Sequence, residues 1–270
     1  MLNSYLTLGL KRGIKLLSEF NILLALGIML FVFFTVDSSN ILNITVDNIG
    51  VYLANVAPMS LNTYTESNPD WFQGWTLFYW AWWIAFAAPT GIFIARISKG
   101  RTLREFVFGV MFIPVGLSFA WLTIFGNSAL DLIQNQGMES LGAAVMADSS
   151  TALFKFFELL TEVKLVSYAA LLCILVFFIT TADSGTLVIS ILTSSKEENA
   201  PVWQRAFWVA LECFLAATLL IVGGLAAIQS ALIILGFPFA IIMCLMTISL
   251  LKEIRIDLAE RQPSVTAVPT

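Results

Sequence analysis

Aromatic side chains recur at helical spacing in one stretch of the chain. Intervals of four, three and four residues place a first set along one helix face: Trp75, Tyr79, Trp82 and Phe86. Trp80 and Trp83 form a second stripe beside it. An aromatic face attracts a cation by about 2 kcal/mol or more once desolvated, and a quaternary ammonium suits it because it donates no hydrogen bond. The spacing fits such a cation site and an interfacial belt of tryptophans equally well.

A stripe of hydroxyl side chains lies on a later apolar segment. Positions i, i+3, i+4 and i+7 are occupied by Phe177, Thr180, Thr181 and Ser184. Sodium is a hard cation and favours oxygen ligands, which threonine hydroxyls and freed backbone carbonyls supply. The same hydroxyls can instead bond the carbonyl four residues earlier or a neighbouring helix. The spacing by itself favours this second interpretation.

One carboxylate, Glu212, falls near the middle of another apolar segment, where a charge is costly and indicates function. It is expected to be buried and protonated, to bind or relay a proton, or to bond Thr218 or another helix. The chain has no histidine, and its three cysteines lack metal-like spacing. We find no nucleophile with a base and no cofactor loop, so the chain is not expected to be an enzyme or to bind a cofactor or nucleic acid.

These residues need long apolar elements to position them. Hydrophobic residues make up 59% and charged residues 12% of the 270 residues, whereas soluble domains carry about 25% charged residues. A membrane-spanning helix needs about 20 apolar residues, and such windows occur at 20–36, 74–95, 105–125, 165–187, 203–223 and 229–251. The sequence predicts an all-α membrane protein with a single membrane domain over 1–270, of which 1–19 and 252–270 lie outside the bilayer.

The distribution of charge orients these six segments, because cationic loops stay in the cytoplasm. Threading the segments through a bilayer puts all of the 14 Lys and Arg residues on one side except Lys155 and Lys164. Acidic residues such as Asp37, Asp47 and Asp131 gather on the other side. Both termini are therefore predicted to be cytoplasmic.

Two outer connections carry structure of their own. Apolar residues recur at near-helical spacing from Ile41 to Val56, which predicts an amphipathic helix on the outer surface that Pro58 and the polar run at 62–70 end. The connection over 127–161 is expected to begin with a turn at Gly126-Asn127 and to end in a helix over 152–160. Residues 262–270 are expected to be unstructured.

Several motifs closely resemble the betaine/carnitine/choline transporter family. They are GWTLFYWAWWIA at 74–85, FIARISKGRTLREF at 93–106, FGNSAL at 125–130 and FFITTADSG at 177–185, in the order and spacing of that family. The resemblance covers nearly the whole chain. It implies a LeuT-like fold, in which ten of twelve spans form two inverted five-helix repeats. The chain looks like the second half of such a protein, without the N-terminal half that completes the substrate site.

The resemblance also assigns roles to residues. Trp83 matches the central substrate tryptophan, and Trp80 and Trp82 match its neighbours along the permeation path. Phe86 stands where tryptophan is usual, so its π-face is weaker, and the following 87–91 depart from the family pattern. A last matching segment, which supplies sodium ligands in sodium-coupled members, contains Phe177, Thr180 and Thr181.

The expected function is secondary active, ion-coupled uptake of choline, glycine betaine or carnitine, driven by Na+ or H+, with symport in a bacterial plasma membrane. The resemblance also implies assembly as a homotrimer. The alternative is a truncated remnant that does not transport, or one subunit of a split transporter.

Overall fold

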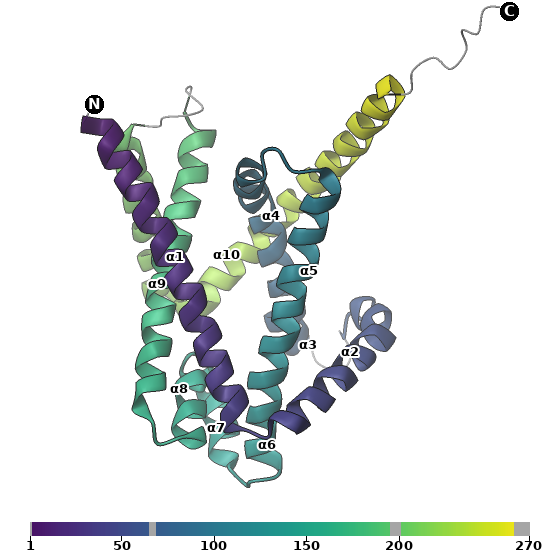
Figure 1. The fold of residues 1–270 in the computed structure, drawn as a ribbon, viewed down its shortest axis with the longest axis vertical. Helices are drawn as coiled ribbons and strands as arrows, with labels where there is room; N and C mark the ends of the chain where they lie inside the picture. The colour runs from purple at the N-terminus through teal and green to yellow at the C-terminus, as the bar shows by residue number, and fades with distance from the viewer. Residues whose placement is uncertain (1, 65–68, 195–200, 262–270) are drawn as a thin grey trace, which may run out of the picture. The chain divides into compact units, whose positions relative to one another are not determined.

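The computed structural model describes residues 2–64, 69–194 and 201–261, and within these ranges every regular element is helical. Figure 1 traces the helices from α1 at the N-terminal end to α10 at the C-terminal end. The all-α prediction is therefore confirmed. The expectation for 262–270 lies outside the described residues.

The chain divides into two compact units, which are described separately. Unit 1 comprises Met1–Asn62 and Gly100–Ser184, and unit 2 comprises Thr63–Lys99 and Gly185–Thr270. The helix α9 (Lys164–Leu192) runs through the boundary between them.

Unit 1 is built around α1 (Leu2–Thr35) and the first part of α9. Apolar side chains from the two helices share one buried cluster, which also takes in two adjacent phenylalanines; it contains Ala25, Ile28, Met29, Val32, Val166, Ala170, Cys173, Phe156 and Phe157. The phenylalanines come from the short helix α8 (Ala152–Leu160) and meet the ring of Phe125 at centroid distances of 6.0 and 6.3 Å. The cluster holds α1, α8 and the first part of α9 together.

The predicted outer amphipathic helix is α2 (Ser38–Ser60). Asp37 caps its first turn, accepting hydrogen bonds from the backbone N–H groups of Ser39 at 3.0 Å and Asn40 at 3.1 Å. Pro58 lies inside the helix instead of ending it, because proline disturbs the helix N-terminal to itself and the turn after it continues to Ser60.

A continuous helical stretch replaces the turn predicted at Gly126-Asn127. The helix α5 (Leu103–Leu122) passes through a π-helical turn, η2 (Thr123–Asn127), into α6 (Ser128–Gln134). A π-turn accommodates one extra residue without breaking the run of backbone hydrogen bonds, so Gly126 and Asn127 stay helical.

The rest of the second outer connection is also mostly helical. It contains α7 (Glu139–Ala147), the 3-10 turn η3 (Ser149–Thr151) and α8, whose bounds agree with the predicted helix over 152–160. Asp148 caps η3 by accepting bonds from the hydroxyl of Ser150 at 2.6 Å and its backbone N–H at 2.9 Å, and these bonds lower the pKa of the Asp148 carboxyl.

In unit 2, α4 (Phe78–Ile97) packs against α10 (Val202–Arg261). The contact is close because both sides are small: a Cβ added at Gly236 would lie 2.9 Å from the Cβ of Ala81 and 3.1 Å from its carbonyl oxygen. A short helix α3 (Pro69–Trp71) and a π-helical turn η1 (Phe72–Leu77) lead into α4.

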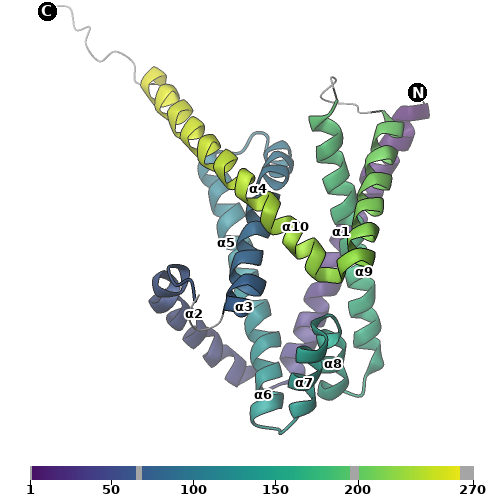
Figure 2. The ribbon, with the colours of Figure 1, turned by 180° about the vertical axis from the view of Figure 1, so that it is seen from behind.

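The helix α10 changes direction in its interior, as Figure 2 shows. Gly223 has φ −148° and ψ 17°, and Gly224 has φ 61° and ψ −154°. Gly224 adopts a backbone conformation that side chains with a Cβ rarely tolerate. The two predicted segments 203–223 and 229–251 therefore lie on either side of a glycine break, not on either side of a loop.

Among the described residues, four helical stretches are long and apolar enough to cross a membrane: Lys15–Thr35, Leu103–Gln134, Lys164–Leu192 and Trp203–Ala259. A fifth consists of Pro69–Ala87 and Pro89–Ala95, which meet at a bend of 44°. One stretch of 57 residues far exceeds the 20 or so that one crossing needs. Helix occupies all six predicted windows, and six crossings in a single membrane domain remain a prediction.

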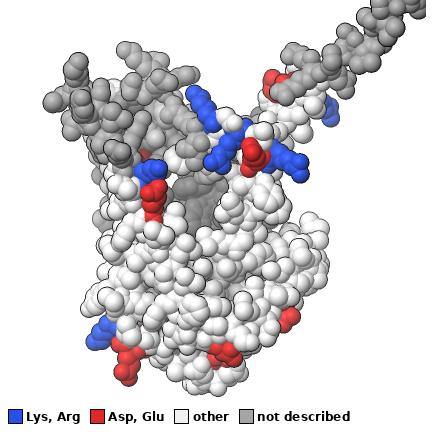
Figure 3. Space-filling view, viewed as in Figure 1, with Lys and Arg blue, Asp and Glu red and all other residues white. Residues whose placement is uncertain are grey.

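The surface of these helices is apolar, as a lipid-facing surface requires. Large side chains such as Leu23, Phe34 and Phe178 are exposed. In the space-filling view, Asp and Glu side chains appear at the end of unit 1 that holds α6, α7 and α8, while the length of its helices is largely uncharged (Figure 3). Unit 1 thus carries acidic side chains where the sequence places an outer surface.

The close contact between α4 and α10 yields a stability prediction. Gly236→Ala should destabilise the protein by about 1–3 kcal/mol, because the new methyl group meets backbone atoms of Ala81 that cannot move aside. The apparent melting temperature of the purified protein in detergent would fall. Gly116→Ala in α5 is the matched control, since a Cβ there meets nothing within 4 Å. Equal melting temperatures for the two variants would refute the contact.

Candidate functional site

The predicted aromatic face forms a chain of ring contacts along η1 and α4. Trp75 stacks on Tyr79 with centroids 5.9 Å apart, and Tyr79 lies 5.8 Å from Trp82. Trp82 in turn meets Phe86 edge to face at 6.3 Å. Offset stacked and edge-to-face pairs are the favourable arrangements for aromatic rings. The face predicted from spacing is therefore present, although its role in binding is untested.

Trp83 belongs to the same aromatic group but projects from a different position on α4. Its ring meets Tyr79 at 6.4 Å, edge to face, and the side chain is 66% exposed. Ala81, two residues away, is only 6% exposed, because Gly236 covers it. At about 100° per residue, Trp83 lies roughly 200° around the helix from Ala81. Helix α10 thus covers the small-residue side of α4 and leaves Trp83 on the opposite side.

The packing of α10 decides which side of α4 is open. The space next to Ala81 is filled by Gly236. Open space remains on the far side of α4, where Trp80 and Trp83 are both exposed. The rings are accessible from that side.

Two backbone irregularities set the direction of the aromatic face. The π-turn η1 immediately precedes α4, and a π-turn rotates the residues before it relative to those after it. Pro89 lies three residues beyond Phe86, next to the 44° bend. The rings from Phe78 to Phe86 therefore occupy a regular helical stretch between two irregular ones.

The hydroxyl stripe lies on α9, as its spacing predicts. Thr180 Oγ1 donates to the carbonyl oxygen of Val176 at 2.9 Å and approaches that of Phe177 at 3.1 Å. Ser184 Oγ donates to the carbonyl oxygen of Thr180 at 2.8 Å. These are the bonds expected if the hydroxyls bond the preceding turn of their own helix. A hydroxyl that donates its proton keeps its oxygen lone pairs, so the bonds leave Thr180 able to accept a cation.

Glu212 is bonded to another helix. Thr186 Oγ1 on α9 donates to Glu212 Oε2 on α10 at 3.3 Å, whereas Thr218 bonds the carbonyl of Phe214 in its own helix. The start of α10 is tied to α9 a second time, because Gln204 at 2.8 Å and Trp208 at 3.1 Å both donate to Thr193 Oγ1. Of the alternatives left open for Glu212, a bond to another helix is the one observed.

The two sets of predicted site residues fall in different units. Trp80, Trp82, Trp83 and Phe86 belong to unit 2, and Phe177, Thr180 and Thr181 belong to unit 1. Within unit 2 the rings contact one another, and within unit 1 the hydroxyl stripe is continuous along α9. Each set is therefore described by itself.

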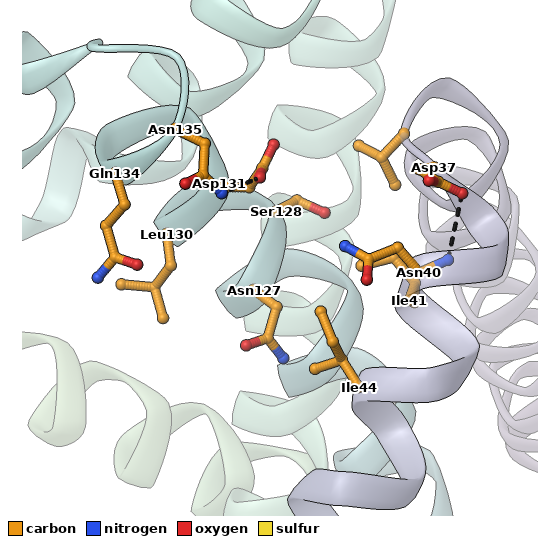
Figure 4. A pocket seen from close by; sticks show the side chains of 11 residues that line it. Asp37, Asn40, Ile41, Ile44, Asn127, Ser128, Leu130, Asp131, Gln134 and Asn135 are labelled. Carbon is orange, nitrogen blue, oxygen red and sulfur yellow. Dashed lines mark hydrogen bonds between the residues drawn. The ribbon is translucent and has the colours of Figure 1, made fainter.

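A polar pocket that the sequence did not predict lies inside unit 1. Its volume is about 180 Å³, and it is lined by Val36, Asp37, Asn40, Ile41, Ile44, Asn127, Ser128, Leu130, Asp131, Gln134 and Asn135. Figure 4 shows Asn40 reaching from α2 toward Asn127 and Ser128 at the junction of η2 and α6. The FGNSAL motif contained part of this lining, but its partners on α2 are far away in the sequence and their spacing gave no signal.

Comparison with known proteins identifies relatives among bacterial transporters. The chain is 45% identical to a glycine betaine transporter of Acinetobacter baylyi over 94% of its own length and 38% of the relative. It is 41% identical to a glycine betaine/proline/choline/ectoine transporter of Vibrio parahaemolyticus, over 93% of its length and 45% of the relative. An osmo-independent choline transporter of Acinetobacter baylyi is 40% identical, over 97% of this chain and 51% of the relative.

The chain therefore spans between 38% and 51% of the length of these relatives. Residues 3–259 match the model of the betaine/carnitine/choline transporter family (BCCT), and the chain belongs to that family.

Proposed function

We propose that this chain contributes to ion-coupled uptake of a small quaternary-ammonium solute such as choline, glycine betaine or carnitine. The observation that carries the proposal is the exposed aromatic surface of α4 in a member of this family. Relatives named as glycine betaine and choline transporters support the solute class. The proposal places the protein in a bacterial plasma membrane with both termini in the cytoplasm.

Trp83 is proposed as the main contact for the ammonium group, with Trp80, Trp82 and Phe86 along the path. Trp83 is the most exposed of the three tryptophans, at 66% against 52% for Trp80 and 38% for Trp82. Its indole contacts Tyr79 edge to face, and most of the side chain stays exposed. A preorganised ring loses little freedom when it binds a cation.

Sodium is proposed as the coupling ion, with Phe177, Thr180 and Thr181 supplying oxygen ligands. The hydrogen bonds of Thr180 to Val176 and Phe177 hold its hydroxyl oxygen in one orientation. Thr181 is exposed on the neighbouring position of α9. Proton coupling is the alternative, for which Glu212 on α10 is a candidate carboxylate within a membrane-spanning stretch.

The chain is proposed to act together with a segment equivalent to the remaining length of its relatives, in a homotrimer. The aromatic surface of α4 faces away from α10 and would meet such a segment. The second candidate function is a remnant that does not transport, or one subunit of a split transporter. Uptake assays in proteoliposomes separate these possibilities. Saturable uptake of choline, glycine betaine or carnitine is measured for this chain alone and for this chain together with the remaining segment. Uptake in the first case, only in the second, or in neither distinguishes an independent transporter, a split transporter and a remnant.

Removal of the proposed ammonium contact should weaken the binding of choline and so reduce uptake at low choline concentration. Trp83→Ala loses a cation–π interaction of about 2 kcal/mol, so KM for choline should rise about 30-fold. Trp83→Phe keeps a π-face and should show a smaller rise. Trp203→Ala, at the start of α10, is the control and should transport normally. Normal KM in Trp83→Ala would exclude this residue as the contact.

Removal of both threonine hydroxyls should change the dependence of uptake on sodium. In a Thr180→Ala/Thr181→Ala variant, the sodium concentration for half-maximal uptake should rise at least about tenfold, because two oxygen ligands are lost. Thr180→Ser retains a hydroxyl and should stay close to the original value. Thr247→Ala removes a hydroxyl that bonds only its own helix turn at Met243 and serves as the control. Uptake driven by a pH gradient without sodium would support proton coupling instead.

A further inference from the structure

We propose that the polar pocket of unit 1 is a second binding site, which holds a small organic ammonium ion and favours a net cation over a zwitterion. The choice of choline as the ligand rests on the proposed function; the charge preference rests on the pocket itself. The site lies on the predicted outer side, and its lining includes neither the tryptophans of α4 nor the hydroxyl stripe of α9.

Charge around the pocket favours a cation. Two carboxylates, Asp37 and Asp131, line it, and none of the described lining residues is Lys or Arg. Two helices also end beside it, α1 at Thr35 and α6 at Gln134, and a helix C-terminus carries a partial negative charge. The N-terminus of α2, which Asp37 caps, carries the opposing partial positive charge. The two carboxylates and the two helix C-termini outweigh it, so the net charge around the pocket is negative.

The two carboxylates are held in place. Asp131 accepts hydrogen bonds from the side chains of Asn135 at 2.7 Å and Gln136 at 2.9 Å, one on each of its oxygens. A carboxylate has about four lone-pair positions, so both oxygens keep accepting capacity. Asp37 is fixed by the backbone of the first turn of α2. Little reorganisation is needed when a cation enters.

The walls are also fixed. Asn48 on α2 donates to Thr123 on η2 at 3.2 Å, and Tyr52 meets Phe119 edge to face at 5.4 Å. Ser128 at the base of the pocket is 3% exposed and bonds the carbonyl of Ile124. The wall between α2 and the α5–α6 stretch is therefore tied together at several points.

Size and lining select an organic ion over a bare inorganic one. A cavity of about 150 Å³ accommodates a benzene-sized molecule, so about 180 Å³ suits a molecule of the size of choline. Ile41, Ile44 and Leu130 supply apolar surface for methyl groups, and Asn40 and Asn127 supply polar atoms for a hydroxyl. The carboxylate of glycine betaine would face Asp37 and Asp131, and like charges repel.

The test is equilibrium binding of radiolabelled choline and glycine betaine to the purified full-length protein in low-salt detergent buffer. The variant Asp37→Asn/Asp131→Asn neutralises the pocket, and asparagine caps a helix as well as aspartate does. The control Asp47→Asn/Asp148→Asn makes the same charge change outside the pocket. A second variant, Leu130→Lys, adds an ammonium group to the lining without altering either carboxylate.

We expect two classes of choline site, of which the weaker is absent in Leu130→Lys and at least tenfold weaker in the pocket variant. The control should keep both classes, and glycine betaine should occupy one class only. Unchanged choline binding in Asp37→Asn/Asp131→Asn and Leu130→Lys would overturn the proposal. An equal loss of choline binding in the control variant would also overturn it. Binding of Ca²⁺ or Na⁺ that depends on the pocket, with no binding of choline there, would overturn it as well.

The same samples separate this inference from the proposed function. Trp83→Ala should lose the stronger class and keep the weaker one. If the protein transports no quaternary-ammonium solute, yet choline binding still depends on Asp37 and Asp131, the proposed function fails and the pocket stands. If uptake is normal and a single class of sites remains in every variant, the proposed function stands and the pocket proposal fails.

Discussion

The close approach of α10 to α4 at Gly236 and Ala81 decides how the tryptophans of this protein can be used. A helix pair in a membrane gains little from burying apolar surface, since lipid is equally apolar, so small residues that let backbones approach carry the association. Indole rings cannot occupy such a contact. The alanine side of α4 therefore turns toward α10, and Trp83 is left on the side where a solute or another protein segment can reach it.

Interruptions in the helices are the second constraint, and each keeps the backbone hydrogen-bonded. A membrane offers no water to satisfy a freed N–H or carbonyl group. The π-turns η1 and η2 change the phase of a helix while its bonding continues. The glycines at 223 and 224 instead allow a change of direction inside α10. Such local changes let long apolar helices reorient without an extended loop.

Polar side chains in this protein follow two patterns of bonding. Hydroxyls on the apolar helices, such as Thr180 and Ser184, bond the preceding turn and remain able to accept. The carboxylate of Glu212 instead joins two helices through Thr186. In the pocket of unit 1, carboxylates and amides gather at helix ends, where neighbouring residues satisfy part of their capacity and hold the rest in a fixed direction.

The amino-acid sequence determined the helical class, the apolar windows, the aromatic stripe of α4 and the family, because these depend on composition and on periodicity along one element. Matching relatives confirm a family of transporters rather than enzymes. The turn expected at Gly126-Asn127 was wrong, since residue propensities there yield to the continuing hydrogen bonds of a helix. Which side of α4 is covered, the partner of Glu212 and the pocket between α2 and α6 were decided only by the tertiary structure. Each joins residues far apart in the chain, and no spacing within one helix records which distant surface will pack against it.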